Sequence, residues 1–107
     1  MKKLKIKALK KGLFGKREKI IAEVWVENGK VKVKAINEKI EKEILADIEP
    51  AAYGRGFRIA PSREEQGYYQ KINDPEFLKA IMYADFWGHK IYDGWDVLPV
   101  ASKVVEE

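Results

Sequence analysis

The sequence predicts an α+β fold: a three-stranded antiparallel sheet, including a hairpin with an Asn-Gly turn, packed on one face against two main helices. Three observations lead to this prediction. Residues 20–27 and 30–36 are rich in β-branched residues and flank the Asn-Gly pair at 28–29, the preferred pair for a two-residue hairpin turn. Residues 38–48 repeat isoleucine and leucine at helical spacing. The Asp-Pro pair at 74–75 is a second helix-start signal, and strands followed by helices are typical of this class.

The first strand is expected over residues 3–8, where charged and apolar residues alternate with the period of a half-buried strand. This alternation directs Leu4, Ile6 and Ala8 to the core and the intervening lysines to solvent. Residues 10–17 are expected to form a loop, because two glycines interrupt them.

The hairpin that follows has a definite expected register. Pairing outward from the turn matches Glu27 with Lys30 and continues to Ala22 opposite Ala35. One face is then built of alanine and valine. The other face has cross-strand Glu–Lys pairs, with Trp25 opposite a lysine.

The first helix is expected over residues 38–48, with Asn37 as its N-cap and the Glu-Pro pair at 49–50 as its end. Residues 51–61 are expected to be irregular, because glycine and proline recur there. A capping-box pattern then predicts a short helix over residues 62–69.

The second main helix is expected to start after Asp74, with Pro75 as its first residue, and to end at Gly88. The Asp-Gly pair at 93–94 predicts a turn. Residues 95–105 are expected to supply a short C-terminal strand, interrupted by a proline.

The 107 residues are expected to form a single domain, residues 1–107. The absence of cysteine excludes disulfides, thiolate nucleophiles and cysteine-ligated metals, and a single histidine excludes a multi-histidine zinc site within one chain. No cofactor or metal is therefore expected. The composition, rich in lysine and glutamate, is typical of heat-adapted proteins.

The apolar runs are too short for a membrane-spanning helix, so no membrane span is expected. The Lys-rich start lacks the apolar segment of a secretory signal, which predicts a cytoplasmic protein.

Charge is distributed unevenly along the chain, although the net charge is only +4. Residues 1–20 contain nine Lys or Arg and one Glu, whereas residues 74–107 contain three Lys and seven acidic residues. The basic start predicts contact with phosphates, and two arginines beside aromatic residues in segment 53–58 offer stacking groups. The nucleic-acid-binding candidates are Lys5, Lys7, Lys10, Lys11, Lys16, Arg17, Arg55 and Arg58. The alternative is a solvated edge strand whose lysines discourage aggregation.

Aromatic residues are concentrated in the second half of the chain, where ten of the twelve lie between Tyr53 and Trp95. Most are expected to fill the core, and a surplus left exposed would form a contact surface for a protein partner or a second copy of the chain. The protein-interface candidates are Trp25, Trp87, Tyr92 and Trp95.

The one histidine, His89, lies four residues from both Asp85 and Asp93. On an unbroken helix these three would share a face. They could then bind a divalent metal, or His89 and a carboxylate could form a candidate catalytic pair. Gly88 and the turn at 93–94 make such a helix improbable, so the sequence favours a non-catalytic protein.

Two classes of function therefore remain open. The first is a small non-catalytic interaction module that associates with a protein partner or with itself through aromatic residues. The alternative is a nucleic-acid-binding accessory protein that uses the basic start together with Arg55 and Arg58.

Overall fold

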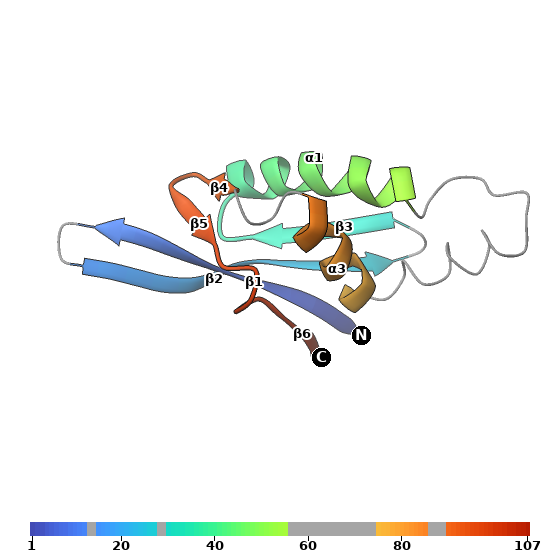
Figure 1. Ribbon diagram of the computed structural model, residues 1–107, viewed down its shortest axis with the longest axis horizontal. Helices are drawn as coiled ribbons and strands as arrows, with labels where there is room; N and C mark the ends of the chain where they lie inside the picture. The colour runs from blue at the N-terminus through green and yellow to red at the C-terminus, as the bar shows by residue number, and fades with distance from the viewer. Residues whose placement is uncertain (13–14, 28–29, 56–74, 86–89) are drawn as a thin grey trace, which may run out of the picture.

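The computed structural model of the chain describes residues 1–12, 15–27, 30–55, 75–85 and 90–107. Its centre is a six-stranded antiparallel sheet in the order β3-β2-β1-β5-β4, with β6 also paired to β1 (Figure 1). The strands are β1 (Lys2–Gly12), β2 (Gly15–Glu27), β3 (Lys30–Ala35), β4 (Ile91–Tyr92), β5 (Trp95–Val97) and β6 (Lys103–Glu106). The helices are α1 (Glu38–Arg55) and α3 (Pro75–Asp85).

The predicted fold, a three-stranded sheet with two main helices on one face, is wrong. The sheet has six strands and curls into a half-barrel, and α1 is the one long helix of the described chain. Beyond β1, β2 and β3, the sheet contains β4, which was not predicted, and β5 and β6, which lie where one C-terminal strand was expected; the three have two, three and four residues. Strands this short have too few residues to show the alternation by which a strand is predicted.

The central strand β1 is confirmed in its inward face and corrected in its length. Leu4, Ile6 and Ala8 are fully buried, as their alternation predicts. The expected loop over residues 10–17 is wrong, because β1 runs on to Gly12 and β2 begins at Gly15 as its pair. Gly15, the first residue of β2, has a φ of 116°, a conformation that residues with a β-carbon rarely adopt and that glycine permits.

The β2–β3 hairpin has the predicted register over its whole length. Glu27 pairs with Lys30, and the pairing continues to Ala22 opposite Ala35. Val24 is fully buried against the core, and the intervening Glu and Lys side chains lie on the sheet face away from α1. Turn chemistry and local patterning therefore suffice for this element.

Helix α1 begins as predicted and ends later than predicted. The Asn37 side chain accepts a hydrogen bond from the Ile40 backbone N–H at 2.9 Å, which caps the first turn. Ile40, Ile44 and Ile48 are buried against the sheet. The helix continues to Arg55 rather than ending at residues 49–50. A proline removes one hydrogen bond from a helix, and this loss does not end α1.

The turn predicted at residues 93–94 is confirmed, and it joins β4 to β5. Asp93 and Gly94 both have positive φ, 51° and 82°, as a type I′ hairpin turn requires. Its flanking residues Tyr92 and Trp95 pair across the turn and are buried, with 3% and 5% of their surface exposed.

The C-terminal strand expected over residues 95–105 is in fact two strands, β5 and β6. Both pair with β1, and the segment between them is fixed to β1 by hydrogen bonds. The Leu98 N–H donates to the Lys7 carbonyl at 2.8 Å, and the Lys7 N–H donates to Ser102 Oγ at 3.0 Å. Ser102 is fully buried and donates in turn to the Leu98 carbonyl, so each end of this polar contact is satisfied.

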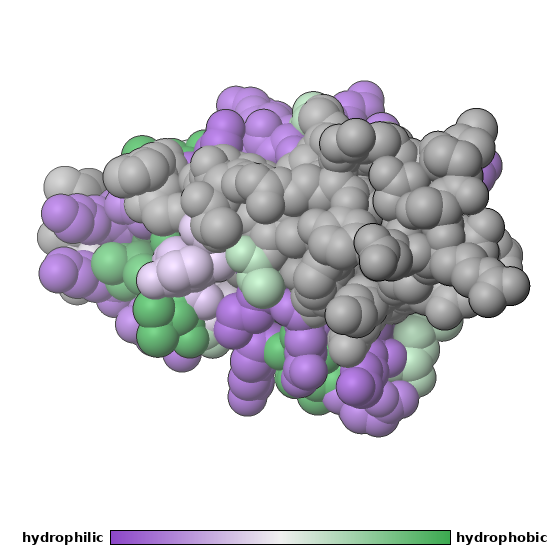
Figure 2. Space-filling model, turned by 45° about the vertical axis from the view of Figure 1, so that its right-hand side comes forward, coloured by the Kyte–Doolittle hydropathy of each residue, from purple (hydrophilic) through white to green (hydrophobic). Residues whose placement is uncertain are grey.

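The helix expected over residues 62–69 lies outside the described residues. No helix in the described ranges is long and apolar enough to cross a membrane. On the face shown in Figure 2, hydrophilic side chains project along the lower edge and at the left-hand end, where the β1–β2 hairpin lies in Figure 1.

Candidate nucleic-acid interface

The far end of the β1–β2 hairpin runs past α1, β4 and β5 (Figure 1). We call its described residues, 9–12 and 15–19, the basic arm. They include five basic residues and one acidic residue, and the five basic residues are all exposed. The two strands stay paired to their ends, from Leu9 opposite Glu18 to Gly12 opposite Gly15. The arm is therefore a two-stranded ribbon with excess positive charge.

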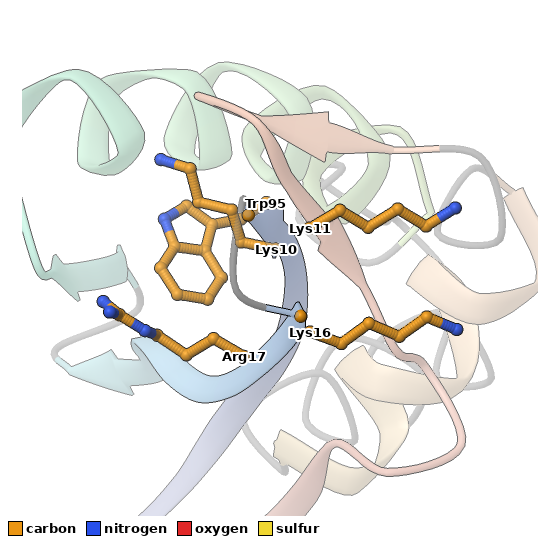
Figure 3. A pocket seen from close by; sticks show the side chains of 7 residues that line it. Lys10, Lys11, Lys16, Arg17 and Trp95 are labelled. Atoms are coloured by element: carbon orange, nitrogen blue, oxygen red, sulfur yellow. The ribbon is translucent and has the colours of Figure 1, made fainter.

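Strand alternation distributes these charges over both faces of the arm. Lys10 follows Ala8 at a spacing of two, so it lies on the core-facing side, and its partner there is Arg17. Lys11 and Lys16 pair on the other side. Figure 3 shows Lys11 and Lys16 extending in the direction opposite to Lys10 and Arg17.

A β-bulge sets which residues of β2 face the core side of the arm. The register shifts between Ile6 and Lys7, so Ile21 is the extra residue on β2, and Ile21 and Ala22 are both buried. In a regular strand, Glu18 would lie on the same side as Ala22, because the two are four residues apart and side chains alternate between the faces. Without the extra residue, Glu18 would therefore be on the core-facing side. The bulge thus removes the arm's one carboxylate from the side that faces β5.

Trp95 lies at the base of the arm. Its strand β5 pairs with β1 through Val97 opposite Ala8 and Asp96 opposite Leu9. This register brings the ring of Trp95 to Lys10, whose Nζ lies 5.5 Å from the ring centroid, within cation–π range. The lysine stem also passes the turn, since a β-carbon on Gly94 would meet Lys10 Cε at 3.4 Å.

A pocket of about 420 Å³ lies between Trp95 and the arm (Figure 3). Its described lining consists of Trp95 and residues 10–12 and 15–17. These supply four cationic side chains and no carboxylate. The sequence alone suggested that charge and aromatic residues are segregated along the chain. The fold instead brings a tryptophan from the acidic C-terminal segment to the basic start.

The basic residues of the arm have no carboxylate partner in the described part of the chain. No described Asp or Glu lies within ion-pair distance of Lys10, Lys11, Lys16, Arg17 or Lys19. Glu18 pairs instead with Lys7, at 3.1 Å. Within the described chain, these five cations are therefore available to an anionic ligand without the loss of an ion pair.

Lys5, also a nucleic-acid candidate, differs because carboxylates already surround it. Its Nζ lies 2.7 Å from Glu23 Oε1 and 2.5 Å from Glu107 Oε1, and its side chain is only 12% exposed. Hydrogen bonds to Glu107 and then to Glu23 raise the pKa of Lys5. The hydrogen bond from Lys5 in turn lowers the pKa of Glu23. A phosphate would have to displace both carboxylates to reach this ammonium group.

The two remaining basic candidates lie away from the described arm. Arg55 is the last residue of α1, and Arg58 lies outside the described residues.

Of the interface candidates, Tyr92 and Trp95 are buried in the core. The Tyr92 hydroxyl donates to Asp47 Oδ2 at 2.8 Å, and burial together with this carboxylate raises the pKa of the phenol. Trp25 is half-buried on the sheet face away from α1, with Lys3 Nζ 4.6 Å from its ring centroid. Trp87 lies outside the described residues. The described aromatic candidates therefore do not form one exposed patch.

The histidine constellation is not assembled on a helix. α3 ends at Asp85, and Asp93 belongs to the β4–β5 turn, where it accepts hydrogen bonds from Asn37 Nδ2 at 3.4 Å and Lys39 Nζ at 3.3 Å. His89 lies outside the described residues. Among the described residues, no group of three or more acidic or histidine side chains is placed to hold a metal ion.

Comparison with known proteins gives no family for this arrangement: no protein-family model, curated protein or solved structure matches the chain.

Proposed function

We propose that this protein binds nucleic acid through the basic arm. The observation that supports the proposal is a set of five exposed cations on both faces of one ribbon, with an aromatic ring at its base. None of the five has a carboxylate partner among the described residues. Cations that neutralise phosphates release counterions, and aromatic rings beside them accept bases. A β-ribbon is also narrow enough to enter a nucleic-acid groove.

The alternative of an aromatic contact surface has less support. Tyr92 is buried, and Trp95 is covered except where its ring borders the pocket at the arm. Trp25 is half-buried and has a lysine over its ring. An anionic membrane would also attract the arm. Attraction by charge alone, however, gives no role to the tryptophan ring that lies beside the cations.

The test compares two variants that remove equal charge. One is Lys11→Gln/Lys16→Gln/Arg17→Gln on the arm, and the other is the exposed set Lys30→Gln/Lys32→Gln/Lys34→Gln on β3. Fluorescence anisotropy with a labelled oligonucleotide measures affinity at low salt. We expect the arm variant to lose affinity by roughly ten-fold or more. The β3 variant should lose far less, because its lysines lie away from the arm and beside glutamates.

Three results would contradict the proposal. The first is equal loss in the two variants, which would show a response to net charge alone. The second is no binding of any oligonucleotide by the unmodified protein. The third is retention on phosphatidylserine vesicles without binding to oligonucleotides, which would assign the arm to a membrane surface.

A further inference from the structure

The ring of Trp95 is held rigidly and has one side toward the arm. Trp95 belongs to the buried core cluster with Tyr92 and Val97, and only 5% of its surface is exposed. Its strand is fixed by pairing to β1 on one side and to β4 on the other. A ring fixed in this way loses little conformational freedom when a ligand stacks on it.

The ammonium group of Lys10 lies over the arm-facing side of this ring, and the cation–π interaction that keeps it there is weak. Lys10 is exposed, and its Nζ contacts the ring at 5.5 Å without a carboxylate partner in the described chain. A cation–π contact of an exposed lysine is weaker than the stacking of a nucleobase on an aromatic side chain. A base can therefore displace the ammonium group from Trp95, and the released lysine remains close enough to contact a phosphate.

The pocket beside the ring has the size and charge for one nucleotide unit. Its volume of about 420 Å³ lies within the range of small-ligand sites. Its lining supplies Arg17 and lysines for a phosphate, and the lining residues that the structure describes include no carboxylate. A single strand can extend a base onto the ring directly, whereas a duplex must first unpair and unstack that base at an energetic cost.

We infer that the pocket formed by Trp95, Lys10 and Arg17 is a subsite for one nucleotide of a single-stranded nucleic acid, whose base stacks on Trp95. This inference rests on the proposed function. It adds to that function a preference for single strands and a base contact that supplements the phosphate contacts.

The first test uses the fluorescence of a protein in which Trp95 is the one tryptophan, Trp25→Phe/Trp87→Phe. It is titrated with oligo(dT) and oligo(rU) of about twelve nucleotides, within the site size of single-strand binding proteins. A duplex of equal length is titrated in parallel, and anisotropy of the labelled strand reports binding in each mixture. We expect quenching of Trp95 by the single strands and little quenching by the duplex. A response to oligo(rU) alone, or to oligo(dT) alone, would identify the nucleic acid.

The matched control is the protein in which Trp25 is the one tryptophan, Trp87→Phe/Trp95→Phe. Trp25 also has a lysine over its ring, at 4.6 Å, but it lies on the other face of the sheet. Its fluorescence should not change on binding. Equal quenching of Trp25 and Trp95 would overturn the inference.

A second measurement uses the unmodified protein, so it does not depend on how a core tryptophan variant folds. An oligonucleotide containing 5-iodouracil is irradiated with the protein, and the cross-linked peptide is identified by mass spectrometry. We expect the cross-link at Trp95. The subsite is refuted if the cross-link maps to another residue, or if anisotropy shows binding while the fluorescence of Trp95 does not change. Either result leaves the proposed function standing. Absence of all binding refutes both.

Discussion

The salt dependence of binding gives a quantitative test of the basic arm. Five cations of the arm have no carboxylate partner in the described chain. If each contacts a phosphate of a single strand, the slope of log K against log salt is about −3.5, at about −0.7 per contact. Raising the salt from about 50 to about 200 mM should then weaken binding about 130-fold.

Charge removal should change this slope by a predictable amount. Lys11→Gln/Lys16→Gln/Arg17→Gln leaves two phosphate contacts, so the slope should become shallower, at about −1.4. The same salt step should then weaken binding about seven-fold. Anisotropy titrations at four or five salt concentrations measure each slope. If the slope of this variant equals that of the unmodified protein, the assignment of phosphate contacts to the arm is refuted.

Lys5 provides the internal control for the same reasoning. Because Glu23 and Glu107 already neutralise it, Lys5→Gln should leave the slope near that of the unmodified protein. If Lys5→Gln lowers the slope as much as Lys11→Gln, availability of the cation is not what determines binding.

Three further predictions concern the framework of the fold. Tyr92→Phe removes a hydroxyl that donates to the Asp47 carboxylate, so urea unfolding should show a loss of about 1.5 kcal/mol; no loss would contradict the role of this contact. Gly94→Ala places a side chain at a φ of 82° and should lower the free energy of unfolding by about 1 kcal/mol, with a matching fall in Tm. The control Gly12→Ala changes a residue without positive φ and should lower both quantities much less. Glu23 has a pKa lowered below 4.5, so its stabilising effect is present above pH 4.5 and is lost as the pH falls through the lowered pKa. Glu23→Gln should remove that part of the acid sensitivity in pH-dependent unfolding curves, and identical curves would count against it.

Local patterns were sufficient at the two turns that an Asn-Gly or an Asp-Gly pair marks in the sequence. The register from Glu27–Lys30 to Ala22–Ala35 follows from one turn and one alternation, and the structure has it. The turn at residues 93–94 follows equally from its Asp-Gly pair. Such elements need no information about distant segments.

Predictions failed within the β1–β2 hairpin and at a contact that depends on a distant strand. Gly12 and Gly15 suggested a loop, but β1 and β2 stay paired as far as these two glycines. The contact of Lys10 with Trp95 depends on which strand β5 pairs with, and no local signal encodes that choice. A bulge also moves Glu18 to the opposite face, and one extra residue in a strand has no recognisable sequence signature here.

The pairing of β1 with both C-terminal strands has a consequence for the order of folding. The Lys7 N–H finds its partner on Ser102, 95 residues along the chain, and β5 and β6 both pair with β1. The β1–β2–β3 meander can form from local contacts while translation continues, but one edge of β1 stays unpaired until the C-terminal strands are made. Contacts of such sequence separation slow folding, and an unpaired strand edge is open to other chains meanwhile. The lysines of β1 therefore have a second effect: mutual repulsion between nascent chains protects this edge until β5 and β6 arrive.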